Sequence, residues 1–123
     1  MNKRLLVVDD EAAILMAFKK ILQEKGIVVD TADTLEDVKT LLNVQAYTAV
    51  ITDLGLSGAH GREGLEVIRH VKEHYPETHV ILMTAYGNPD VMEETYNLGA
   101  AFYFEKPVTV KKIKDALQSL GVY

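Results

Sequence analysis

The chain has 123 residues, 48% of them hydrophobic and 25% charged, which fits one globular domain over residues 1–123 and is too short for two. Thirteen basic and eighteen acidic side chains give a net charge of −5, which argues against a general nucleic-acid-binding surface, and the absence of cysteine excludes disulfides and thiolate zinc sites. No apolar run reaches the roughly 20 residues of a membrane span, and acidic residues end the first run too early for a secretory signal, so we expect a cytoplasmic protein with no membrane partner.

Short apolar runs recur about every 25 residues and are continuous rather than alternating, which is typical of strands covered on both faces. The runs are 5–8, 27–29, 49–51, 80–83 and 101–104. A segment with helical periodicity follows each run, so the sequence predicts five strand–helix units in succession.

The predicted helices can be placed by their apolar faces and by their end signals. The expected inward faces, in chain order, are Ile14, Phe18, Ile21 and Leu22; Leu35, Val38, Leu41 and Leu42; Leu65, Ile68 and Val71; and, in the fifth helix, Val110, Ile113, Leu117 and Leu120. Thr34, Asn88 and Thr109 are predicted N-caps, with Pro89 in the first turn after Asn88. Gly26 and Gly99 are predicted to close the first and fourth helices.

Alternating strands and helices predict an α/β fold with an open, doubly wound parallel sheet and helices on both faces, because five units are too few for an eight-fold barrel. In such a sheet, binding sites lie outside the carboxyl ends of the strands. The candidate functional residues, which have ionisable or hydroxyl side chains, lie at these ends. They are Asp9 and Asp10 after the first strand, Asp53 after the third, Thr84 after the fourth and Lys106 after the fifth.

This set of side chains suits phosphoryl transfer. Two carboxylates about 4 Å apart repel by about 4 kcal/mol at an effective dielectric of 20, so a cluster of Asp9, Asp10 and Asp53 calls for a cation. Oxygen ligands that leave room for water favour Mg²⁺, and Lys106 offers a second positive charge. A metal, a lysine and a carboxylate nucleophile are the parts that phosphoryl transfer requires.

From about residue 3 to residue 120 the chain resembles the receiver domains of two-component response regulators. The resemblance rests on four short motifs in the expected order, at 6–11 (LVVDDE), 50–54 (VITDL), 83–87 (MTAYG) and 102–107 (FYFEKP). It implies a flavodoxin-like strand order 2-1-3-4-5 and a cis bond between Lys106 and Pro107.

The resemblance also implies a role for each matching residue. Asp53 would accept a phosphoryl group from the phosphohistidine of a sensor histidine kinase or phosphotransfer protein. Asp9, Asp10 and Asp53, with the backbone carbonyl of Gly55, would hold Mg²⁺, and Lys106 and Thr84 would contact the phosphoryl oxygens.

Tyr103 would change rotamer as Thr84 moves, altering the surface of the fourth helix, fifth strand and fifth helix toward an effector or a second copy. Gly55 and Tyr86 stand at the family positions that modulate dephosphorylation. We expect no direct nucleic-acid binding and no enzymatic activity beyond the domain's own phosphoryl transfer and slow autodephosphorylation.

The chain departs from the family pattern after the phosphoacceptor. Gly55 and Ser57 replace a polar residue and a proline, and the Gly-Leu-Glu of residues 64–66 comes eleven residues after Asp53 instead of about eight. This spacing predicts a three-residue insertion within residues 55–61.

Three other patterns could indicate binding sites, but a structural role is favoured for each. Gly55, Gly58 and Gly61 lack the dinucleotide-binding spacing, so a flexible loop is favoured. His70 and His74 lack a third zinc ligand, so an exposed helix face is favoured. Lys111, Lys112 and Lys114 are expected to form a solvated face.

Two alternative functions fit the sequence less well than the phosphorylated switch. A receiver-like binding module that works without phosphorylation is disfavoured by the complete set of Asp, Thr and Lys residues. An aspartyl-phosphate phosphohydrolase would carry its nucleophile after the first strand in an Asp-x-Asp pattern, which residues 9–11 do not match.

Overall fold

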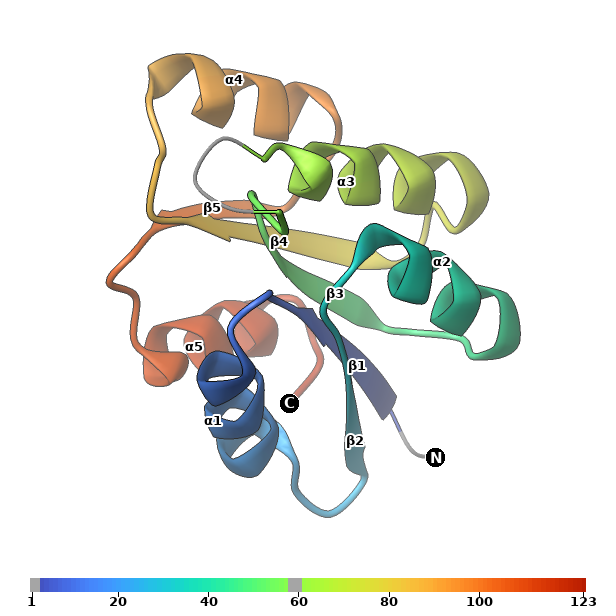
Figure 1. Ribbon diagram of the computed structural model, residues 1–123. Helices are drawn as coiled ribbons and strands as arrows, with labels where there is room; N and C mark the ends of the chain where they lie inside the picture. The colour runs from blue at the N-terminus through green and yellow to red at the C-terminus, as the bar shows by residue number, and fades with distance from the viewer. Residues whose placement is uncertain (1–2, 58–60) are drawn as a thin grey trace.

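The computed structural model describes residues 3–57 and 61–123, and within them five strands alternate with five helices (Figure 1). The strands are β1 (Lys3–Val8), β2 (Ile27–Ala32), β3 (Ala49–Asp53), β4 (His79–Thr84) and β5 (Phe102–Glu105). The helices are α1 (Ala12–Leu22), α2 (Leu35–Val44), α3 (Glu63–His74), α4 (Pro89–Asn97) and α5 (Val110–Ser119). The five predicted units are confirmed, with β5 starting one residue after the predicted run.

All neighbouring strands are parallel, and their order in the sheet is β2-β1-β3-β4-β5. The doubly wound α/β class and the flavodoxin-like order are therefore confirmed. The register pairs Val8 with Thr52, Asp53 with Met83 and Thr84 with Glu105. This alignment brings the carboxyl ends of β1, β3, β4 and β5 to one edge of the sheet.

The core has two layers because successive strand residues point to opposite faces of the sheet. Leu6 and Val8 join the layer under α2, α3 and α4, whereas Leu5 and Val7 join the layer under α1 and α5. Figure 1 shows α1 and α5 on one side of the sheet and α2 and α3 on the other. The predicted inward residues that lie in the two layers or pack against them are Ile14, Phe18, Leu22, Leu35, Val38, Leu41, Leu42, Leu65, Ile68, Val71, Val110, Ile113, Leu117 and Leu120.

The predicted N-caps are confirmed. The Thr34 and Thr109 hydroxyls and the Asn88 side-chain oxygen each accept a backbone N–H from the first turn, at 3.1, 3.1 and 2.9 Å. Pro89 is the first residue of α4, and Gly99 follows this helix with φ +105°, a backbone conformation that favours glycine. The N-caps fix where three of the loops at the carboxyl ends of the strands finish.

Two predictions about α1 were wrong. Ile21 is 50% exposed, because the helix turns this position away from the sheet. Gly26 does not close α1, which ends at Leu22 with Gln23 as its C-cap. Gly26 instead lies in the turn before β2 with φ +85°, and its carbonyl accepts the Lys3 N–H at 2.7 Å.

Within the described ranges, no helix is both long and apolar enough to cross a membrane.

Candidate functional site

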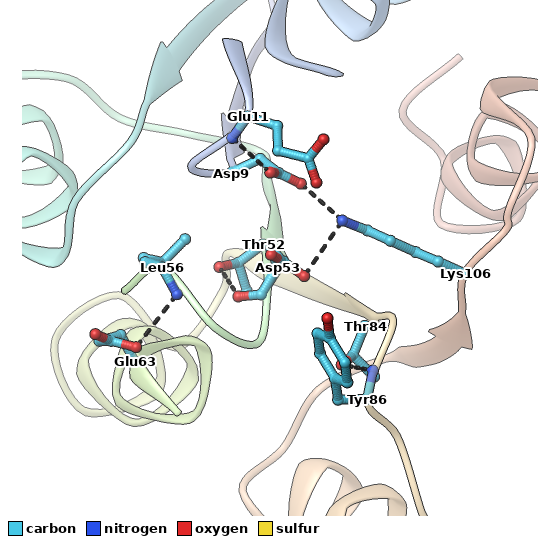
Figure 2. Close-up of polar contacts among 9 residues, drawn as sticks. All are labelled: Asp9, Glu11, Thr52, Asp53, Leu56, Glu63, Thr84, Tyr86 and Lys106. Atoms are coloured by element: carbon cyan, nitrogen blue, oxygen red, sulfur yellow. Dashed lines mark hydrogen bonds and ion pairs between the residues drawn. The ribbon is translucent and has the colours of Figure 1, made fainter. Parts of the chain in front are cut away.

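The edge formed by the strand ends gathers the predicted acidic and basic residues (Figure 2). Asp9 follows β1 and Lys106 follows β5, while Asp53 is the last residue of β3. The Lys106 ammonium lies 3.0 Å from Asp9 Oδ2 and 3.4 Å from Asp53 Oδ1. Residues almost a hundred positions apart in the sequence therefore share one ion-paired cluster, as their places at parallel strand ends predicted.

Asp10 completes an acidic cluster with Asp9 and Asp53. One carboxylate oxygen from each residue lies within 4.8 Å of the other two. Asp9 is fully buried, Asp53 is 8% exposed, and Asp10 is exposed at the rim. Three hard oxygen donors, one of them open to water, fit a cation such as Mg²⁺, which keeps part of its hydration shell when bound to proteins.

Burial raises the pKa of Asp53 to about 6. The Lys106 charge opposes this shift, and the Asp9 carboxylate adds to it. Burial also acts to lower the pKa of Lys106, but the hydrogen bond to Asp9 and the charges of Asp53 and Asp9 outweigh it and raise that pKa. One ammonium thus serves two carboxylates, with the shorter contact to Asp9, and Asp53 remains the less compensated of the two.

Backbone packing holds Asp53 and Asp9 in place. A Cβ at Gly64 would overlap the Asp53 carbonyl oxygen and lie 2.7 Å from the Leu54 Cα, so only glycine lets α3 start this close to the end of β3. The buried Thr52 hydroxyl donates to the same carbonyl at 2.9 Å. On the other strand, Asp9 Oδ1 accepts the Glu11 N–H at 2.9 Å. Sequence reasoning gave neither Thr52 nor Gly64 a role at the site.

Thr84 is the last residue of β4, and Tyr86 lies two residues later in the loop that leads to α4. The Thr84 hydroxyl oxygen accepts the Tyr86 backbone N–H at 2.9 Å, which leaves its own proton available for another acceptor. A pocket of about 170 Å³ opens between these elements, lined by Asp10, Glu11, Asp53, Gly55, Ala85, Tyr86 and Lys106. Tyr86 is 62% exposed, and Figure 2 shows its ring directed toward the side where Asp53 and Lys106 lie.

The sequence profile of the response regulator receiver domain family matches residues 5–118. The chain belongs to this family. The receiver domain is 28% identical over 118 residues to sporulation initiation phosphotransferase F of Bacillus subtilis, covering 96% of this chain and 93% of that protein. It is 33% identical over 113 residues to the alginate biosynthesis transcriptional regulatory protein AlgB of Pseudomonas putida, covering 92% of this chain but only 25% of AlgB.

Among solved structures, the beryllofluoride-activated NtrC4 receiver domain dimer has a subunit that superposes with a TM-score of 0.80 at 31% identity. The match covers 95% of this chain and 98% of that one. The chain spans nearly the whole of some relatives and about a quarter of others. The relatives therefore differ in how much further sequence they carry besides the receiver domain.

The loop after Asp53 is held by Glu63, the first residue of α3. Glu63 Oε1 accepts the Leu56 N–H at 3.2 Å, and a hydrogen bond from Ser57 is the main cause of the lowered pKa of Glu63. Gly55 lines the pocket of the receiver domain, and its predicted roles as a metal ligand and a modulator of dephosphorylation stay predictions. The predicted insertion and Gly58 fall largely on residues 58–60, which lie outside the described residues.

Tyr103 lies on β5 beside the predicted output surface. Its hydroxyl donates to Glu105 Oε2 at 3.2 Å, and its backbone N–H donates to the Tyr96 hydroxyl oxygen at 3.1 Å. The bond between Lys106 and Pro107 is cis, as the family resemblance implies.

The weaker patterns have mixed outcomes. His74 is exposed as expected, but His70 is partly buried, and its Nε2 is buried with no hydrogen-bond partner among the described residues. The prediction of an exposed face is wrong for His70 because α2 packs beside this part of α3. Lys111 and Lys112 are exposed as predicted, whereas Lys114 pairs with a glutamate after α1 at 3.0 Å.

Proposed function

We propose that this receiver domain is a switch activated by phosphorylation of Asp53, with the phosphohistidine of a sensor histidine kinase or phosphotransfer protein as donor. The observation that supports this most strongly is the Asp53 carboxylate at the pocket, 3.4 Å from the Lys106 ammonium and beside two further carboxylates. With a pKa of about 6, Asp53 is mostly ionised at pH 7 and available as a nucleophile.

In the proposed transfer, an Asp53 carboxylate oxygen forms the new bond to phosphorus while the bond from phosphorus to the donor imidazole nitrogen breaks. The electron pair of the broken bond stays on that nitrogen, which then takes a proton. Lys106 would pair with the phosphoryl oxygens, which is supported by the contact of its ammonium with the Asp53 carboxylate. The Thr84 hydroxyl can donate a hydrogen bond to another phosphoryl oxygen, because its oxygen only accepts the Tyr86 N–H.

Asp9, Asp10, Asp53 and the Gly55 carbonyl are the groups that would hold Mg²⁺. When bound, the ion supplies positive charge against the phosphoryl oxygens and offsets the repulsion among the carboxylates. Asp9 already accepts hydrogen bonds from Lys106 and from the Glu11 N–H. Asp10 accepts neither of these hydrogen bonds, so its carboxylate is the more open of the two to the cation.

Mass spectrometry of the intact protein tests the proposed acceptor. Incubation with phosphoramidate and Mg²⁺ should add one phosphoryl group, and Asp53→Asn should abolish the addition, as should EDTA. Asp33→Asn, which alters an exposed carboxylate in the loop after β2, is the matched control and should label like the wild type. Full labelling of Asp53→Asn would show that the acceptor is wrong, and no labelling of the wild type would favour a module that works without phosphorylation.

We further propose that the phosphorylated state is read through the α4-β5-α5 surface by an effector or by a second copy of the chain. The exposed Met92 and Tyr96 and the partly buried Tyr103 support this surface. The NtrC4 receiver domain, which is similar in structure, is a dimer in its beryllofluoride-activated form. We propose no nucleic-acid contact and no turnover beyond the domain's own phosphoryl transfer and slow autodephosphorylation.

A further inference from the structure

Gly87 lies in the β4-α4 loop, three residues after Thr84, and faces the end of the Tyr103 side chain. A Cβ at residue 87 would overlap the Tyr103 hydroxyl and would lie 2.5 Å from Glu105 Oε2 and 3.0 Å from Tyr103 Cζ. The phenol therefore occupies space that any side chain at residue 87 would need. Gly87 does not have a positive φ, so alanine can adopt its backbone conformation.

Glu105 also contacts the end of the Tyr103 side chain, close to the position that a Cβ at residue 87 would take. Its Oε2 accepts the Tyr103 hydroxyl at 3.2 Å. Residues 103 and 105 point to the same face of β5, since side chains alternate along a strand, so the hydrogen bond joins neighbours on that face. Burial raises the pKa of the Tyr103 phenol, and the hydrogen bond and charge of Glu105 raise it further, as expected for a phenol beside a carboxylate.

We propose that Gly87 and Glu105 are positioning residues that keep the Tyr103 phenol against the β4-α4 loop. The space left by the missing side chain of Gly87 and the Glu105 carboxylate together are called the clasp. The clasp joins the loop that follows Thr84 to the strand that precedes Lys106, so it connects both arms of the site to the α4-β5 surface. This inference rests on the proposed function only where it links Tyr103 to Asp53.

Tyr103 has space to move when the clasp opens. A hollow of about 120 Å³ lies next to its ring, lined by Asn88, Pro89, Met92, Tyr103 and Glu105. A larger groove of about 440 Å³ is also lined by Tyr103 and extends to Lys112 of α5. The groups that a Cβ at residue 87 would displace are the ends of two side chains rather than backbone, so Gly87→Ala should move the phenol while the fold is kept.

Fluorine NMR of the full chain labelled with 3-fluorotyrosine tests the clasp without any phosphoryl donor. The Tyr103 signal is assigned with Tyr103→Phe, and its titration gives the phenol pKa. Gly87→Ala should shift the Tyr103 signal and lower its pKa by about half a unit or more, and Glu105→Gln should lower the pKa while the ring stays packed. Glu93→Gln, which removes an exposed carboxylate from α4, is the matched control and should change neither quantity.

The clasp is wrong if Gly87→Ala leaves both the Tyr103 signal and its titration as in the wild type, or if Glu105→Gln leaves the titration unchanged. A thermal melt of Gly87→Ala in the wild-type and Tyr103→Phe backgrounds separates the clash from a general effect on the loop. The loss in melting temperature should be smaller in Tyr103→Phe, because the closest overlap is with the hydroxyl. If Gly87→Ala does not fold, the Glu105→Gln titration alone decides.

Phosphoramidate labelling of the same variants separates this inference from the proposed function. We expect Gly87→Ala to change the rate of phosphoryl uptake by several-fold. In this variant the displaced Tyr103 no longer contacts the loop after Thr84 as it does in the wild type, so the movement of that loop changes. If the fluorine signals show that Tyr103 has moved but the uptake rate is unchanged, the clasp is supported and the coupling of Tyr103 to Asp53 is refuted. A wild type that takes up no phosphate would refute the proposed function, while the fluorine readouts would still decide the clasp.

Discussion

Gly55 and Tyr86 line the pocket beside Asp53, where we propose that they limit how water can reach a phosphoryl group. Hydrolysis of an aspartyl phosphate needs a water positioned in line with the bond that breaks, and such positioning contributes a substantial part of the rate. Gly55 offers no side chain to hold this water, and the Tyr86 ring, directed toward Asp53 and Lys106 (Figure 2), would hinder its approach. We therefore expect the phosphorylated form to be long-lived compared with receivers that carry polar residues at both positions.

Decay of the phosphorylated protein in excess Mg²⁺, followed by mass spectrometry, measures this lifetime. Gly55→Asn combined with Tyr86→Glu should speed decay by several-fold, because both side chains can accept a hydrogen bond from the attacking water. Tyr86→Phe is the control for loss of the hydroxyl alone and should decay like the wild type. A wild type that already decays as fast as the double variant would contradict the argument.

At the scale of elements, the proposed switch runs from the phosphoacceptor through β4, the β4-α4 loop and β5 to the proposed output surface. Phosphate on Asp53 can shift a two-state equilibrium only by interacting differently with the two states. A change from 1:99 to 99:1 requires about 5.5 kcal/mol, which a few charge-assisted hydrogen bonds of about 1.5–3 kcal/mol each can supply. The Thr84 hydroxyl is the donor on this path, since its oxygen is already tied to the Tyr86 N–H.

Thr84→Ala should therefore accept phosphate but lose most of the response of the output surface. In amide NMR spectra, phosphorylation should shift the signals of Met92, Tyr96 and Tyr103 strongly in the wild type and weakly in Thr84→Ala. Thr84→Ser keeps the hydroxyl and should retain the response. Equal shifts in the wild type and Thr84→Ala would show that the coupling does not pass through this hydroxyl.

The same elements show what the sequence could predict and what it could not. Apolar runs, caps and strand ends are local patterns, and the parallel topology then brings Asp9, Asp53 and Lys106 together without further information. Gly64 was given no role because its contact with the Asp53 carbonyl depends on how closely α3 packs on β3. The buried Nε2 of His70 depends likewise on which helix packs beside it.

At the scale of the whole molecule, the burial of Asp53 has a consequence for stability. The native state raises the pKa of this carboxyl from 3.8 to about 6, so the folded protein binds the proton more tightly than the unfolded chain does. The contribution of Asp53 to folding stability therefore falls as pH rises from about 4 through about 6, and at pH 7 the full cost of the buried charge is present. Without a cation, Asp53→Asn should be more stable than the wild type at pH 7 by about 1–3 kcal/mol.

Urea denaturation in EDTA at several pH values measures this difference. The advantage of Asp53→Asn should be largely gone at pH 4, where Asp53 of the folded wild type is protonated, and should vanish below the unfolded pKa of 3.8. The lowered pKa of His70 has the opposite sign and reduces stability as pH falls through about 6.5, but it acts on both proteins and cancels in the comparison. Asp33→Asn, at an exposed site, should stay within about 0.5 kcal/mol of the wild type.

Mg²⁺ should reverse the order of the two proteins. A ligand that binds only the folded state stabilises it by about 2.7 kcal/mol at a hundred times its dissociation constant. The wild type offers three carboxylates to the ion and should gain this stability, whereas Asp53→Asn loses one of them and should gain less. If Asp53→Asn is no more stable than the wild type in EDTA at pH 7, the Lys106 ammonium already compensates the Asp53 charge, and the raised pKa on which the argument rests is wrong.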